Sequence, residues 1–222
     1  MAMTADKHAD DTGRLGAAAA AVAITLAAVL TGISLARSGA MGEPTDVTSG
    51  SEAAGTGTET LASAAPPPAH DPLPPGIPVR LRIPAIDVDT DSVIELRRSP
   101  SGVTEVPGHA RAVGWIEETR TPGERGASVL IGHVRFAYER AVFLRLAELR
   151  PGDKVAVGRA DGSTAVFTVF GIERLPAESA VAKARAHTRH PDLRLLTAPG
   201  HADPGARHPE SILVSARLTS KR

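Results

Sequence analysis

Residues 153–170, with the sequence DKVAVGRADGSTAVFTVF, contain two apolar runs on either side of the turn-forming pair Asp161-Gly162. Both runs are rich in β-branched or aromatic residues, and apolar residues recur about every second position, as in a β-strand with one buried face. An Asp-Gly pair between two such runs is typical of a tight turn that joins antiparallel strands. We therefore predict a β-hairpin here, which is the strongest hairpin signal in the chain.

Short apolar runs of the same kind occupy most of the chain after Pro78, separated by Pro, Gly and Asp. The runs with strand length and β-branched content are VRLRIPAI, ASVLIGHV, DKVAVGRA, STAVFTVFGIERL, LRLLTA and SILVSARL. Mostly antiparallel strands with little helix predict a mainly β domain over residues 78–220, closed into a barrel of about eight strands with one or two short helices. A β-sandwich is the alternative architecture.

Residues 141–152, with the sequence AVFLRLAELRPG, differ from these runs and predict one short helix. Its leucines Leu144, Leu146 and Leu149 are expected to turn inward, and the pair Pro151-Gly152 is expected to end it.

An uncharged and strongly apolar run, LGAAAAAVAITLAAVLTGISLA, occupies residues 15–36. At about 1.5 Å per residue such a helix would be roughly 33 Å long, enough to cross a bilayer. We therefore expect a single-pass anchor in the cell membrane, with a cleaved signal peptide as the alternative. Lys7 and Arg14 precede it and acidic residues count little for orientation, so residues 1–14 are expected to be cytoplasmic and the C-terminal domain extracellular.

Residues 37–77 are rich in Gly, Ser, Thr, Ala and Pro and show no apolar periodicity. This composition is typical of a disordered linker, here expected to tether the domain to the membrane segment. The alternative is a structured segment that folds over the domain. The linker is favoured because the stretch offers few apolar residues that could dock.

The amino-acid composition excludes several kinds of partner and site. The chain has 25 basic and 25 acidic residues, so its net charge gives no reason to expect a nucleic-acid partner. It has no cysteine, which excludes disulfides, thiolate metal sites and thiol nucleophiles. No cofactor is expected. Four histidines fall in a loop-rich stretch without i, i+4 spacing, so they do not predict a metal site; they are His187, His190, His201 and His208.

The loop that follows the Gly-Trp pair is dense in charges of both signs. Glu117, Glu118 and Glu124 stand close in sequence to Arg120 and Arg125. Charged side chains are seldom buried, so we expect them to form a solvated surface.

Three strings, in order along the chain, resemble the sortase family and in particular its short actinobacterial branch, class F. Residues 79–90, VRLRIPAIDVDT, resemble the opening strand of that branch. Residues 106–134 resemble the stretch from the family's Val-Pro, through Gly-Trp and Pro-Gly, to its Gly-His. Residues 141–157 match a Phe-x-x-Leu and then a Pro-Gly-Asp pattern. Their order and spacing carry the resemblance, which covers nearly all of residues 78–218.

The resemblance implies a sortase-type β-barrel that an N-terminal anchor displays outside the membrane. Sortases cut a sorting motif of a secreted protein between Thr and Gly, hold the acyl part as a thioester, and transfer it to an amine of the cell wall or of another protein. This chemistry requires a thiol nucleophile, a histidine that protonates the leaving amine, and an arginine that holds the oxyanion. The implied partner is a sorting-signal-like peptide of a secreted or surface protein.

Two of the three catalytic positions map onto strand ends of this chain. His133, in LIGHV, matches the family's catalytic histidine. The family's cysteine ends a Leu-x-Thr-Cys strand, and the corresponding string LRLLTAPG places Ala198 there. Thr197 matches the family's Thr, and on a strand its side chain faces away from its neighbour's. Pro199 restricts φ and removes an N–H where the family has small residues. A methyl group cannot attack a carbonyl, so the nucleophile is missing.

The third position is the arginine, which the family places shortly before a late strand. This chain has GARHPESILVSA there, with Pro209 or Glu210 at the expected position. Arg207 is therefore the tentative oxyanion residue, and an ordinary solvated loop charge is the alternative.

These departures predict a degenerate sortase, a pseudoenzyme whose groove binds a peptide or partner. Loss of a nucleophile costs about 10⁶ in turnover, and loss of one oxyanion donor about 10² to 10³ more. One alternative is a hydrolase or transpeptidase in which Ser211, Thr197 or an activated water works with His133. Another is a sortase inactivated by a deliberate Cys-to-Ala exchange at Ala198.

Overall fold

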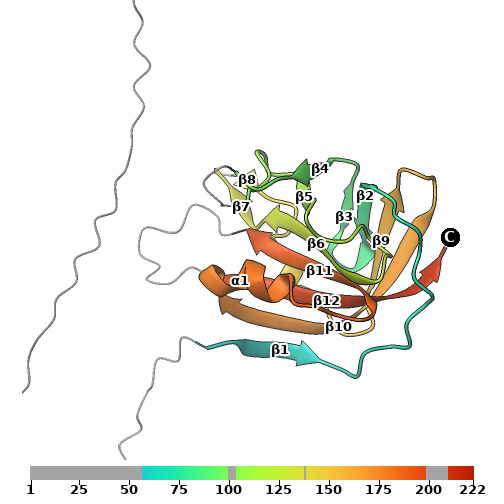
Figure 1. Cartoon of the computed structure of the whole chain (residues 1–222). Helices are drawn as coiled ribbons and strands as arrows, with labels where there is room; N and C mark the ends of the chain where they lie inside the picture. Colours follow the sequence, from blue (N-terminus) through green and yellow to red (C-terminus); the bar gives the residue numbers. More distant parts are fainter. Residues whose placement is uncertain (1–56, 100–103, 138, 199–209) are drawn as a thin grey trace, which may run out of the picture. The chain divides into compact units, whose positions relative to one another are not determined.

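The computed structural model of the chain (Figure 1) describes residues 57–99, 104–137, 139–198 and 210–222. The expected cytoplasmic end and the expected anchor at residues 15–36 lie outside these ranges, as do residues 37–56. Among the residues that are described, no helix is both long and apolar enough to cross a membrane.

Strands are the main regular elements among the described residues. They are β1 (Glu59–Ser63), β2 (Pro78–Ile83), β3 (Val88–Thr90), β4 (Val93–Leu96), β5 (Val113–Ile116), β6 (Gly126–His133), β7 (Arg135–Phe136), β8 (Glu139–Arg140), β9 (Lys154–Arg159), β10 (Thr164–Pro176), β11 (Pro191–Ala198) and β12 (Glu210–Lys221). The helical elements are α1 (Ala177–Ala184) and the 3₁₀ turns η1 (Pro84–Ile86) and η2 (Leu146–Glu148).

A single large sheet organises the domain. Its strand order is β3-β2-β9-β10-β12-β11-β6-β5-β4, and β1 pairs with β10 off this path. The pairs β6–β11 and β4–β5 are parallel, and the other pairs in the sheet are antiparallel. Since β2 also lies against β4, the two ends of the sheet approach each other and the barrel is nearly closed (Figure 1). The mainly β barrel predicted from the sequence is therefore present, with more strands than expected.

The apolar side chains form two clusters on opposite faces of the sheet. The first fills the barrel interior and includes Leu193 and Leu195 of β11. The second includes Leu196 and Ala198 of the same strand and lies on the face that α1 covers. Because successive side chains of a strand point to opposite faces, β11 contributes to both clusters. It is a central strand buried on both sides.

The predicted hairpin is present between β9 and β10. Gly162 has a φ of 81°, a left-handed conformation that glycine adopts without a steric penalty. The Arg159 amide donates a hydrogen bond of 2.9 Å to the Ser163 carbonyl and closes the turn.

The helix predicted at residues 141–152 is only the 3₁₀ turn η2. Leu146 and Leu149 are buried as expected, whereas Leu144 is half-buried. In the part of the chain that the structure describes, the α-helix is α1, with the sequence AESAVAKA, directly after β10. Alanine is the strongest helix former, and Ala180 and Ala184 are one turn apart and pack on the second cluster.

Part of the predicted disordered linker is structured. The prediction of disorder is therefore wrong for residues 59–77. Strand β1 pairs with residues 171–174 of β10, where β10 extends beyond its pairing with β9. Further along, Leu73 is 8% exposed and its amide donates a 2.8 Å hydrogen bond to the Gly123 carbonyl. Backbone pairing with an otherwise open edge orders the segment, and such pairing needs little apolar content.

The docking of this segment can be tested at Leu73. Replacing it by Ala should lower the free energy of unfolding by about 2 to 3 kcal/mol, because a buried side chain is lost and a cavity is left. Urea denaturation followed by circular dichroism measures this value. Ile77→Ala is the matched control, since Ile77 is 53% exposed and should change stability by less than about 0.5 kcal/mol. Equal effects of the two substitutions would contradict the docking.

Candidate functional site

The site lies where β6 and β11 end side by side. The two strands pair in parallel, and their last residues, His133 and Ala198, are register partners. Register partners of neighbouring strands project on the same face, here the face of Ile131 and Leu196 in the second apolar cluster. A side chain at position 198 is therefore a direct neighbour of His133.

Ser211 continues this line onto the next strand. The antiparallel pairing of β11 with β12 ends at Leu196 and Leu213. Two residues further along each strand, on the same face, are Ala198 and Ser211. We call His133, Ala198 and Ser211 the site row. It crosses three adjacent strands and holds no cationic side chain of Lys or Arg.

His133 is held at one of its two ring nitrogens. It is 5% exposed, and its Nε2 lies 2.8 Å from the carbonyl oxygen of Pro107. A carbonyl only accepts hydrogen bonds, so Nε2 carries a proton. Nδ1 is buried and has no hydrogen-bond partner among the described residues. The Phe136 ring packs 5.1 Å away, centroid to centroid. The imidazole is thus fixed in place with one nitrogen unused.

Ala198 presents only a methyl group to this histidine. It is 2% exposed and lies in the second apolar cluster. Its neighbour Thr197 projects to the other face, and the Thr197 Oγ1 accepts a 2.8 Å hydrogen bond from the Ile212 amide. The one hydroxyl adjacent in sequence to position 198 is therefore engaged elsewhere.

The Ser211 hydroxyl does not form a catalytic pair with His133. Ser211 is buried, and its Oγ has no hydrogen-bond partner among the described residues. A nucleophile and its base lie about 2.6 to 3.2 Å apart in a working pair. Neither the Ser211 Oγ nor the His133 Nδ1 has such a contact, and the His133 Nε2 is bound to Pro107.

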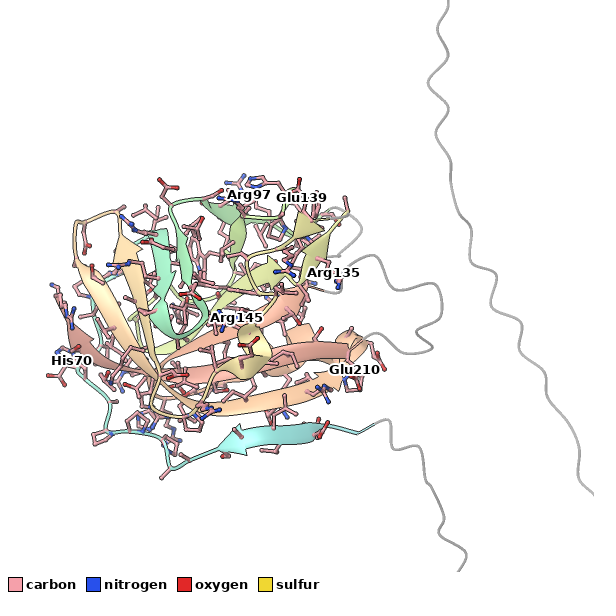
Figure 2. All side chains as sticks on the ribbon, turned by 180° about the vertical axis from the view of Figure 1, so that it is seen from behind. His70, Arg97, Arg135, Glu139, Arg145 and Glu210 are labelled. Carbon is pink, nitrogen blue, oxygen red and sulfur yellow. The ribbon has the colours of Figure 1, made fainter. Side chains whose placement is uncertain are left out.

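The expected arginine region is only partly described. Arg207, Pro199 and Pro209 lie outside the described residues. Glu210, the first residue of β12, is exposed and forms an ion pair of 3.4 Å with Arg174. Figure 2 shows Glu210 at the edge of the domain, away from its interior. The residue that follows it, Ser211, stands beside Ala198 in the site row, which the sequence comparison did not predict.

Gly132 lets the end of β6 pack closely against the following segment. A Cβ at this position would lie 2.7 Å from Cδ2 of Phe143 and 2.8 Å from Cγ1 of Val142. The Phe143 amide also donates a 2.9 Å hydrogen bond to the His133 carbonyl. Residues 142–143 therefore fix the position of His133 from behind, a contact that no local sequence motif reveals.

A pocket of about 800 Å³ adjoins the same end of β6. Its wall includes Ala110 and Val142, which share a hydrogen bond of 2.9 Å from the Val142 amide to the Ala110 carbonyl. The adjacent residue Ala141 bonds to the Val134 carbonyl at 3.1 Å. One part of the pocket wall, which includes Ala141 and Val142, thus belongs to the segment that is bonded directly to the end of β6.

Fold and site together define a class: a nearly closed β-barrel with a histidine at the end of one strand and, on the parallel neighbour, the position where a nucleophile would stand. The sortase domain model matches residues 81–219. This is more than half of the chain, and the protein belongs to the sortase family.

Solved structures agree with this barrel at low sequence identity. A lid mutant of sortase A from Corynebacterium diphtheriae has a TM-score of 0.50 and 19% identity, covering 65% of this chain and 70% of that one. The SrtA sortase of Actinomyces oris has a TM-score of 0.47 and 21% identity, covering 72% of this chain and 89% of that one. At such identities the likeness bears on the fold alone. Comparison with curated proteins gave no match.

The close packing at Gly132 yields a test of how the site is held. Gly132→Ala should lower the free energy of unfolding by about 1 to 3 kcal/mol, because the added methyl group overpacks the contact with Phe143. Denaturant unfolding measures the change. Gly108→Ala serves as the control, since a Cβ there meets no atom within 4 Å. An unchanged stability of Gly132→Ala would show that residues 142–143 do not constrain the end of β6.

Proposed function

We propose that this protein is a degenerate sortase of class F type, which binds a peptide beside His133 without transferring it. The observation that carries the proposal is the site row. The residue in register with His133 is Ala198. Ser211 lies on β12, two residues beyond Leu213, where the pairing of β12 with β11 ends. The site row contains His133, which matches the family's general acid, but it contains no thiol and no cationic side chain.

Each missing group removes a separate step of transpeptidation. Without a nucleophile at position 198 no thioester can form, and the acyl group has no place on the protein. Among the residues that the structure describes, the site row holds no Lys or Arg to support the developing oxyanion, and the tentative oxyanion residue Arg207 lies outside the described residues. The Ser211 side chain is neither a thiol nor a cation. These two departures lie on different strands, which argues against a single deliberate exchange at Ala198.

Binding is the activity that the remaining groups support. The unpartnered His133 Nδ1 is an acceptor that a peptide N–H could satisfy. A pocket of about 800 Å³ lies beside the segment that is bonded to the end of β6, although His133, Ala198 and Ser211 do not line it. A secreted or surface protein that carries a sorting signal is the partner that family membership suggests.

The proposal includes a place in the cell. The apolar run at residues 15–36 would anchor the chain in the membrane as a single pass, and the barrel would stand outside in the envelope.

A hydrolase that uses Ser211 with His133 is the competing function. It is disfavoured because neither the Ser211 Oγ nor the His133 Nδ1 has a hydrogen-bond partner, so the two do not contact each other. Thr197 is disfavoured because its hydroxyl binds the Ile212 amide.

Binding without turnover is tested by NMR titration of the ¹⁵N-labelled protein with a peptide that carries a sorting motif. We expect saturable shifts of amide signals around His133 and residues 139–145, and an intact peptide afterwards. A scrambled peptide of the same composition should leave the spectrum unchanged. His133→Ala should weaken binding about fivefold, the effect of one lost hydrogen bond. Absence of any specific shift would refute the binding function.

A further inference from the structure

A second pocket, of about 700 Å³, lies at the opposite end of β6 from His133. Two loops line it, residues 117–127 before and at the start of β6 and residues 185–189 after α1. Seven residue steps along β6 separate Gly126 from His133, which at about 3.3 Å per residue is roughly 23 Å. This arginine pocket is therefore distinct from the site row.

The pocket wall concentrates positive charge in a chain that is neutral overall. Four arginines face two glutamates, and the set also includes His187; the arginines are Arg120, Arg125, Arg185 and Arg189. The solvated surface that the sequence predicts for residues 117–125 is thus one wall of a cleft, and the second loop brings more cations to it.

Both glutamates of the pocket wall already form ion pairs with arginines. Glu117 pairs with Arg97 at 3.1 Å. Glu118 pairs with Arg98 at 3.1 Å and also with Arg185. Hydrogen bonds from Arg98 and then from Arg185 hold the pKa of Glu118 below its usual value, so this carboxylate stays ionised and paired.

Three arginines of the pocket keep their charge uncompensated. The side chains of Arg120, Arg125 and Arg189 form no hydrogen bond or ion pair with any residue that the structure describes. These three exposed side chains line one cleft, and like charges that share a cleft repel one another. Such an arrangement is relieved by an anion bound between them.

The position of Arg120 is set by the backbone below it. Gly126 has a φ of 117°, and a Cβ there would lie 2.9 Å from Cγ of Arg120. The Arg120 side chain thus lies over a glycine that leaves room for it. The Gly126 amide in turn donates a 3.1 Å hydrogen bond to the His190 carbonyl, which ties the two loops together.

We propose that the arginine pocket binds a phosphate-bearing ligand. Arginine presents a planar fork of donors that matches phosphate oxygens in a bidentate manner. A phosphoryl group carries about 1.5 to 2 negative charges near neutral pH, so one or two such groups balance three arginines. A single carboxylate brings one charge and leaves most of the repulsion in place.

The same phosphate chemistry could come from a soluble compound or from the headgroup of an anionic lipid. The first source would make the pocket a small-molecule site. The second would bring this face of the barrel to the membrane surface. The two sources differ in whether binding requires a bilayer.

Isothermal titration of the full chain with pyrophosphate at 150 mM salt tests the shared chemistry. Weak attractions between exposed charges are largely screened at this ionic strength. Arg125→Ala with Arg189→Ala should weaken binding at least about tenfold, because two charge-assisted hydrogen bonds are lost. Neither side chain has a structural partner, so the double variant should fold. The matched control is Arg135→Ala with Arg140→Ala on the β7–β8 hairpin, which should bind pyrophosphate as the unmodified chain does.

Co-flotation with vesicles of phosphatidylglycerol or phosphatidylcholine separates the two sources. A preference for phosphatidylglycerol that disappears in the Arg125/Arg189 variant supports a lipid headgroup. Pyrophosphate binding without such a preference supports a soluble ligand. The proposal is overturned if pyrophosphate produces no saturable heat, if the two double variants lose binding equally, or if hexaglutamate binds more tightly than pyrophosphate. These results do not depend on peptide binding at His133, so the two proposals fail separately.

Discussion

The parallel, in-register pairing of β6 with β11 is the constraint on which the rest of the site depends. It brings the ends of two strands that are far apart in the sequence onto one face and makes His133 and Ala198 neighbours. The antiparallel partner β12 then adds Ser211 to the same line. A chemical site assembled in this way tolerates no shift, because a slip of one residue would turn each side chain to the opposite face. What stands at these three positions therefore decides what the barrel can do.

The surrounding structure maintains this geometry although Ala198 presents only a methyl group to His133. His133 keeps a hydrogen bond to the Pro107 carbonyl and a packed ring contact with Phe136. Gly132 allows residues 142–143 to press against the strand end. A buried imidazole with an unpartnered nitrogen costs free energy unless something satisfies it. The presence of this unpartnered nitrogen fits a site that still binds a ligand. A binding function therefore explains the buried histidine better than a barrel without any function does.

Features of the fold that depend on local sequence patterns could be predicted from the sequence. Features that depend on the pairing of distant strands could not. The Asp161-Gly162 hairpin and the strand content were predictable, since alternation and turn chemistry are local. Strand β1 was not, because an open edge of β10 orders it through backbone hydrogen bonds. The place of Ser211 beside Ala198 was missed for a similar reason: the spacing of the loop before β12 suggested Pro209 or Glu210, and only the ladder defines the register. The arginine pocket required two loops that no motif connects.

The central claim is that the site row cannot form an acyl-enzyme. Mass spectrometry of the protein and of a sorting-motif peptide after incubation tests this directly. We expect that the unmodified chain cleaves the peptide no more than the His133→Ala variant does. Ala198→Cys alone should cleave it only a little. Ala198→Cys combined with Ser211→Arg should exceed the single variant by about 10² to 10³, the contribution of one oxyanion donor. Cleavage by the unmodified chain above the His133→Ala control would contradict the account.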